Sequence, residues 1–158
     1  MGLNLRKQFG TDTSRENDGV WVELGDGARI LVARYGNAKQ KKLGRRLARP
    51  HRHQLRDIDT SEAAARTVED LEKQTVAHCV LLDWEGILMP DDKGVEKPLD
   101  YSPDVALKLF KDIDDFFLTV VEIARDRANF AAIDQEDTVG NLPAALSGSS
   151  DGAPTKGG

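Results

Sequence analysis

The sequence has one cysteine and no long apolar run, and both shortages limit what the protein can be. The single thiol, Cys79, excludes an intramolecular disulfide and any zinc site built from several cysteines. No apolar run approaches the roughly 18 residues of a membrane-spanning helix, so we expect no membrane association. Residues 1–10 lack the apolar stretch of a signal peptide. We therefore expect a protein of a reducing cytoplasm.

Motifs of catalysis, phosphate binding and metal binding are also missing. The sequence contains no GxGxxG and no Gly-x-Ser-x-Gly. His78 and Cys79 are neighbours in a predicted helix, where adjacent side chains point about 100° apart and cannot bind one ion together. His51 and His53 lie among arginines, without a carboxylate or thiol at ligand spacing. We expect no enzyme activity, no bound metal and no cofactor.

Composition divides the 158 residues into one domain and two polar ends. Residues 1–18 hold only scattered apolar side chains and are expected to form a flexible arm. Residues 141–158 end in a stretch rich in Ser and Gly, which cannot offset its ordering entropy by burial. We predict a single domain over residues 19–140 between disordered termini.

The domain opens with a pattern typical of a β-hairpin. Residues 20–24 and 28–35 alternate between apolar and polar or small side chains, and Gly25-Asp26-Gly27 between them favours a tight turn. Two strands alone are marginally stable in water. The predicted hairpin must therefore lie on helices or pair with the edge of a partner.

Helix patterns follow the hairpin. The first covers residues 38–49, with Leu43 and Leu47 four apart, and ends at Pro50. The second covers residues 59–84, where Asp59 with Glu62 forms a capping box and Val68, Leu71, Thr75, Cys79 and Leu82 form the apolar stripe. Its polar face, expected in solvent, contains Glu69, Asp70, Glu72 and Lys73.

The last third of the domain predicts a loop and two more helices. Residues 90–101 have the composition of a loop, and Ser102-Pro103 starts a helix with a Ser N-cap and a Pro in its first turn. A final helix over 115–131 would bury Phe117, Val120, Val121, Ala124 and Ala128. The fold class is thus α+β, with an N-terminal β-hairpin followed by a bundle of about four helices.

Charge is distributed very unevenly along the chain. Residues 38–56 carry eight Lys and Arg side chains and no acid, so a net charge of −5 leaves −13 on the rest. A solvated helix face explains this, and so does nucleic-acid binding, although no aromatic side chain interleaves the segment for stacking on bases. The third alternative is docking of an acidic protein surface, including that of a second copy of the chain.

A short apolar segment around residues 84–89 is a second candidate for partner binding. Its large side chains either cap the core or form an exposed anchor, since Trp is favoured at binding hot spots and Met at adaptable surfaces. The residues predicted to bind a partner are Lys41, Lys42, Arg45, Arg46, Arg49, Trp84, Ile87, Leu88 and Met89.

Three blocks of sequence carry a family resemblance. The first comprises residues 21–27 and 33–37, the second residues 82–87 and 98–104, and the third residues 116–130, ending at Gly140-Asn141. In this order they resemble small proteins of the tail gene cluster of long-tailed bacteriophages, in particular the tail assembly chaperones.

The resemblance implies a non-enzymatic protein of the host cytoplasm. Such chaperones coat the aggregation-prone tape measure protein while the tail tube is built, so the implied partner is that protein or another phage tail protein. The alternatives are a structural phage protein, either a head–tail connector or a tail-completion subunit, and a nucleic-acid-binding regulator that uses residues 38–56. Self-association is a further expectation.

Overall fold

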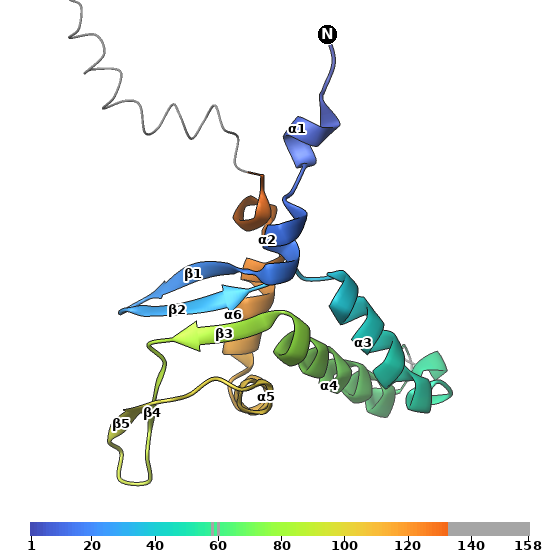
Figure 1. Ribbon diagram of the computed structural model, residues 1–158. Coiled ribbons are helices and arrows are strands. Elements are labelled where there is room, and N and C mark those ends of the chain that lie inside the picture. Colours follow the sequence, from blue (N-terminus) through green and yellow to red (C-terminus); the bar gives the residue numbers. More distant parts are fainter. Residues whose placement is uncertain (58, 60, 133–158) are drawn as a thin grey trace, which may run out of the picture. The chain divides into compact units, whose positions relative to one another are not determined.

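The computed structural model describes residues 1–57, 59 and 61–132, and they belong to two compact units (Figure 1). One unit joins Met1–Asp12 to the chain from Ala131 onward, and the other is Thr13–Phe130. The predicted tail over 141–158 lies outside the described residues.

The first unit contains helix α1 (Leu5–Phe9) and an antiparallel bridge between Thr11 and Ala131. Asn4 caps α1, because its side chain accepts a hydrogen bond from the Lys7 backbone at 3.0 Å. Helical structure thus occurs within the segment expected to be an arm, and its flexibility in solution stays a prediction.

The second unit is built on a three-stranded antiparallel sheet in the order β1-β2-β3 (Figure 1). The predicted hairpin is confirmed as β1 (Val20–Gly25) and β2 (Ala28–Val32). Its turn contains Asp26, which has a φ of 54°. The third strand is β3 (Leu81–Glu85), which pairs with β2. One face of the sheet is buried, and Val22, Ile30 and Trp84 form one row across it.

The helix predicted over residues 59–84 is too long at both ends. Helix α4 is Glu62–Cys79, and its N-cap is Ser61, whose hydroxyl accepts from the Ala64 backbone at 3.2 Å, not Asp59. At the other end, residues 81–85 leave the helix because β2 supplies backbone partners for a strand there.

The loop predicted over 90–101 contains part of a second hairpin. Strands β4 (Leu88–Pro90) and β5 (Glu96–Pro98) pair in antiparallel fashion. The carboxylate of Asp91 organises the turn, since it accepts from the backbone of Lys93 and Val95 at 2.9 Å each and pairs with Lys97 at 3.1 Å. These bonds lower the pKa of Asp91, and the bond from the Val95 backbone has the largest effect.

Helices α3 (Ala38–Ala48), α5 (Pro103–Asp112) and α6 (Asp114–Arg125) follow the sequence pattern closely, with short 3₁₀ helices at Arg49–His51, Gln54–Asp57 and Arg127–Phe130. Helix α2 (Thr13–Asp18) was not predicted, since it lies within the segment expected to be an arm. Ser102 caps α5 as predicted, because its hydroxyl accepts from the Val105 backbone at 3.1 Å. The α+β class, a hairpin followed by helices, is confirmed. None of the described helices combines the length and the apolar character that a membrane span requires.

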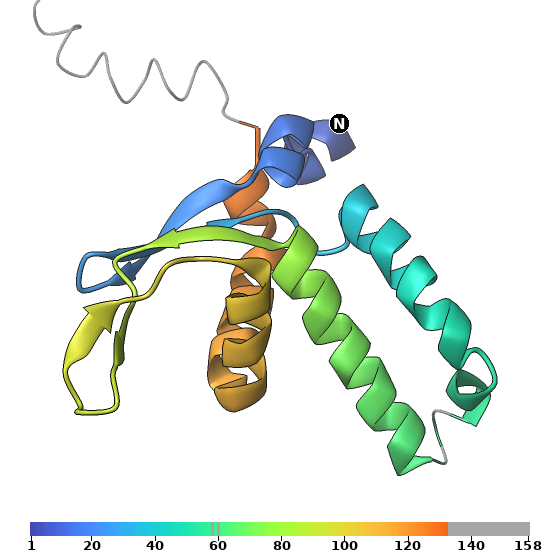
Figure 2. The same cartoon turned by 60° about the horizontal axis from the view of Figure 1, so that its bottom comes forward.

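The core lies between the sheet and helices α5 and α6, which run side by side (Figures 1 and 2). The rings of Phe110 and Phe117 meet edge to face at 5.2 Å. Phe117, Val120 and Ala124 are buried as predicted, but Ala128 lies beyond the end of α6 and is exposed. Phe130 takes a fully buried place instead.

Helix α4 is covered on more than one side, which changes the role of its polar residues. It contacts α3 and α5, so Lys73, expected in solvent, is only 6% exposed. Its ammonium pairs with Glu69 at 3.0 Å and with Asp114 of α6 at 3.3 Å. Burial acts to lower the pKa of Lys73, but these two bonds outweigh it and raise that pKa. Glu72 accepts a hydrogen bond from the Tyr35 hydroxyl.

Two glycines with similar backbone angles provide a matched test of the sheet. Gly86 follows β3 with a φ of 76°, and a Cβ there would lie 2.5 Å from the Gly27 carbonyl oxygen. Gly94 has a φ of 80°, and a Cβ there would meet no atom within 4 Å. We predict that G94A lowers the free energy of unfolding by about 1 kcal/mol through φ strain alone. G86A should cost about 3 kcal/mol, because the turn before β2 must also shift. Urea unfolding measures both, and equal losses would contradict the contact.

Tyr101 should make stability depend on alkaline pH. Burial, with smaller contributions from Asp83 and Cys79, raises its pKa to about 12, whereas an exposed tyrosine ionises near pH 10. Between these values the unfolded chain loses a proton that the folded chain keeps. The free energy of unfolding should therefore fall as pH rises through this window, and less steeply in Y101F. Urea unfolding at several pH values measures this, and an unchanged slope in Y101F would contradict it.

Candidate functional site

Helix α3 is held against α4 by two polar side chains at its N-terminal end. The Asn37 side chain accepts from the Gln40 backbone at 3.0 Å and donates to the Cys79 carbonyl at 2.9 Å. Gln40 is buried, and its amide donates to the Thr75 hydroxyl at 3.2 Å. Because buried polar groups need partners, these bonds fix the position of α3 along α4.

An open groove of about 830 Å³ lies between α3 and α4, which run side by side in opposite directions (Figure 2). Leu43 and Leu47 of α3 give it apolar surface, and Gln74, His78 and Cys79 line it from α4. Its cations are all exposed: Lys39, Lys42, Arg45, Arg46 and Arg49.

The positive charge of this basic groove is not neutralised within the part of the chain that the structure describes. No carboxylate lines the groove, and none of its five cations forms an ion pair with residues 1–57, 59 or 61–132. Arg45 follows Lys41 by four residues and precedes Arg49 by four, and like charges at this spacing destabilise a helix. The groove thus presents fixed positive charge beside apolar surface, which suits an anionic partner.

The thiol in the groove is not activated by the surrounding charge. Burial raises the pKa of Cys79 and outweighs the opposing effect of Lys39 and Arg46. The thiolate is the reactive form of cysteine, so a raised pKa makes Cys79 a weak nucleophile. Its neighbour His78 is exposed. Among the described residues, no three His, Cys, Asp or Glu side chains gather closely enough to hold one metal ion.

The structure brings most of the predicted basic residues together. The groove contains four of the five: Lys42, Arg45, Arg46 and Arg49. Lys41 instead lines a smaller hollow of about 490 Å³, near Gly44 and Leu71. Sequence reasoning did not include Lys39, Gln74 or His78 in the site, although His78 and Cys79 lie next to each other at the end of α4.

The predicted apolar anchor divides into buried and exposed parts. Trp84 is 5% exposed, its indole donates to the Leu99 carbonyl at 2.6 Å, and its ring meets that of Tyr101 edge to face at 5.0 Å. An exposed anchor at Trp84 is therefore wrong, and the alternative that it caps the core is confirmed. Ile87 and Met89 are half-buried against the core.

Leu88 of β4 is the most exposed of the predicted apolar group, at 49%. Strand β4 and helix α3 lie at opposite ends of the Thr13–Phe130 unit in both views (Figures 1 and 2). The structure thus separates the predicted basic and apolar binding residues into two different places.

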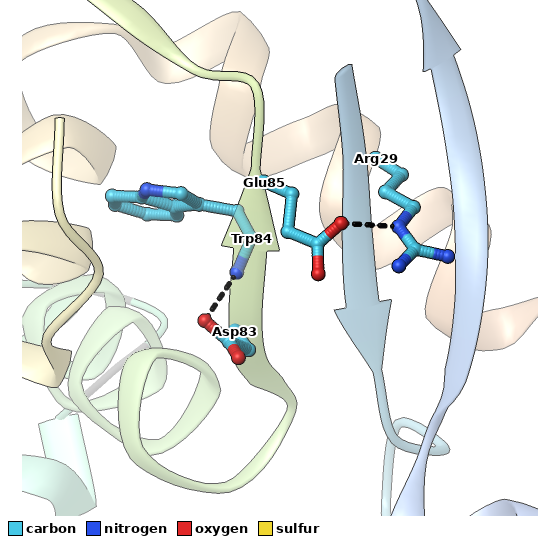
Figure 3. Close-up of polar contacts among 4 residues, drawn as sticks. All are labelled: Arg29, Asp83, Trp84 and Glu85. Atoms are coloured by element: carbon cyan, nitrogen blue, oxygen red, sulfur yellow. Dashed lines mark hydrogen bonds and ion pairs between the residues drawn. The ribbon is translucent and has the colours of Figure 1, made fainter. Parts of the chain in front are cut away.

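The outer face of the sheet carries a cluster that sequence reasoning missed. The Arg29 guanidinium donates to the Glu85 carboxylate at 2.7 Å (Figure 3), and it lies 4.3 Å from the ring centroid of Trp21. Their bond raises the pKa of Arg29 and lowers that of Glu85. Asp83 accepts from the Trp84 backbone at 2.8 Å on the same strand (Figure 3). Because a helix was predicted through Trp84, the sequence did not indicate that Glu85 would lie on a strand beside Arg29.

Comparison with known proteins places the chain in a family. Residues 35–141 match the model of the YdaY prophage protein family, which covers more than half of the chain and includes α3, α4 and the basic groove. No curated protein matches the chain, and no solved structure does. The chain belongs to the YdaY prophage protein family and is phage-derived.

Proposed function

We propose that this phage-derived protein is a non-enzymatic tail assembly chaperone that binds the tape measure protein in the host cytoplasm. The observation that carries the proposal is the basic groove, whose cations have no acidic partner among the described residues. Membership of a prophage family supports it. The three sequence blocks that resemble tail assembly chaperones support it further.

A helical client with one acidic face fits this groove best. Two antiparallel helices offer a channel for a third helix, and Leu43 and Leu47 repeat at the four-residue spacing of a helix face. Client carboxylates beside Lys42 or Arg46 would offset the repulsion among the groove cations. Opposite charge also speeds the encounter between partners. The resemblance to tail assembly chaperones implies a long, helical client, in which we expect such segments.

The chemistry of the groove supports binding over catalysis. Its guanidinium groups stay protonated at neutral pH and cannot act as a general base. The raised pKa of Cys79 keeps the thiol in its neutral form. What the groove supplies is fixed positive charge and apolar surface, which are the means to hold an acidic amphipathic helix.

Charge reversal in the groove should weaken client binding. We predict that R45E/R46E lowers affinity for the tape measure protein about tenfold or more, equivalent to about 1.4 kcal/mol. Both side chains are exposed, so the free energy of unfolding should change by less than about 1 kcal/mol. Binding should also weaken between 0.1 M and 1 M salt, as the screening length falls from about 10 Å to about 3 Å. A binding titration and the soluble fraction of co-expressed client measure the effect.

The matched control is K108E/K111E, which reverses two exposed lysines of α5 and changes net charge equally. Equal weakening by both double variants would show that the groove is not the client site. A tape measure protein that is equally soluble alone would remove the basis for a chaperone. Presence of the protein at fixed copy number in purified virions would point to a connector or tail-completion subunit, and a salt-dependent shift with DNA to a regulator.

A further inference from the structure

We infer that strand β1 is a self-association edge: β1 of one chain pairs antiparallel with β1 of a second copy, about a two-fold axis at Val22. The two three-stranded sheets then form one continuous sheet. This inference is independent of the client groove, because it uses the other end of the Thr13–Phe130 unit (Figure 1).

The outer edge of β1 has no strand beside it among the described residues. The sheet order places β1 at one rim and β2 at the centre (Figure 1). An edge strand turns alternate backbone N–H and C=O groups outward, and these form a template for another strand. Trp21 and Leu24, at 38% and 37% exposed, add apolar surface along the same strand.

The other strand edges in this unit are partly occupied or blocked. Along β3, the Leu81 carbonyl accepts from the Tyr101 hydroxyl at 2.5 Å and the Trp84 backbone N–H donates to the Asp83 carboxylate at 2.8 Å, so these backbone groups already have partners. Strands β4 and β5 each end in proline, which cannot donate to a neighbouring strand. In contrast, residues 20–24 are Val-Trp-Val-Glu-Leu, with no Pro and no Lys to discourage pairing.

Charge and strand length select one register for the pairing. A two-fold axis perpendicular to the sheet keeps each face on its own side, so opposed residues must share a face. Pairing centred on Glu23 would oppose two carboxylates, which is destabilising. Pairing centred on Trp21 would leave Glu23 and Leu24 opposite residues that precede β1. Centring on Val22 places the regular part of β1, residues 20–23, opposite strand residues of the partner, and Leu24 lies at the irregular step between Glu23 and Gly25.

This register also extends the pattern already present on each face. On the inner face, the two copies of Val22 meet between the two copies of Val20, which lengthens the apolar row. On the outer face, Trp21 stands opposite the partner's Glu23. Arg29 lies over Trp21 and opposite Glu23 of its own chain, so positive charge lies next to the added carboxylate.

Cysteine cross-linking tests both the pairing and its register. The full chain with Cys79 replaced by Ser carries either W21C or E23C, two positions exposed to solvent. Directly opposed residues lie within disulfide distance, whereas residues offset by two lie about 7–8 Å apart. We expect mild oxidation to give a covalent dimer, twice the 17.4 kDa of the chain, in a mixture of the two variants but not in either alone. A dimer from one variant alone would overturn the register, and no dimer in the mixture would overturn self-pairing.

Sedimentation of the unmodified chain separates this association from the charge-driven groove. Backbone hydrogen bonds and apolar contacts are little affected by screening, so the dimer should persist at 1 M salt and in R45E/R46E. Dissociation under either condition would overturn β1 pairing and assign self-association to the basic groove instead. The dimer requires no client, so failure of the chaperone proposal would leave this result unchanged.

Discussion

Strand β2 is the constraint on which the rest of the Thr13–Phe130 unit depends. It bonds to a strand on each side, and its Ile30 and Val32 are fully buried. The chain leaving β2 is then tied to three helices by backbone hydrogen bonds. The N–H of Ala33 donates to the carbonyl of Val80, at the end of α4, at 2.8 Å. The N–H groups of Arg34 and Tyr35 donate to the carbonyls of Glu16 in α2 and Ala124 in α6, at 2.8 Å and 3.0 Å. Buried backbone groups must be paired, so the direction of the chain into α3 follows from these bonds.

That direction creates the groove. Asn37 and Gln40 bond to α4, which places the face of α3 with Leu43 and Leu47 beside His78 and Cys79. The cations at the rim repel one another and have no acidic partner in the described part of the chain, so they weaken the free helix. An acidic partner, as proposed above, would offset this cost.

The two proposed contact surfaces rest on different forces and lie apart. The groove uses charge, which salt screens and which speeds encounter. The β1 edge uses backbone hydrogen bonds and apolar side chains, which are direction-specific and insensitive to salt. A chain with both can hold a client at one end while it associates with a copy of itself at the other, because neither surface blocks the other.

Local sequence determined the elements whose signals are local. Alternation along residues 20–32 predicted the hairpin, Ser102 with Pro103 predicted the start of α5, and the run of cations predicted a basic helix. Tertiary structure alone decided that residues 81–85 form a strand, because Leu81 and Trp84 also suit a helix until β2 supplies their backbone partners. It decided the burial of Lys73 as well, because that burial requires Asp114, forty-one residues along the chain, to be brought within an ion pair's reach.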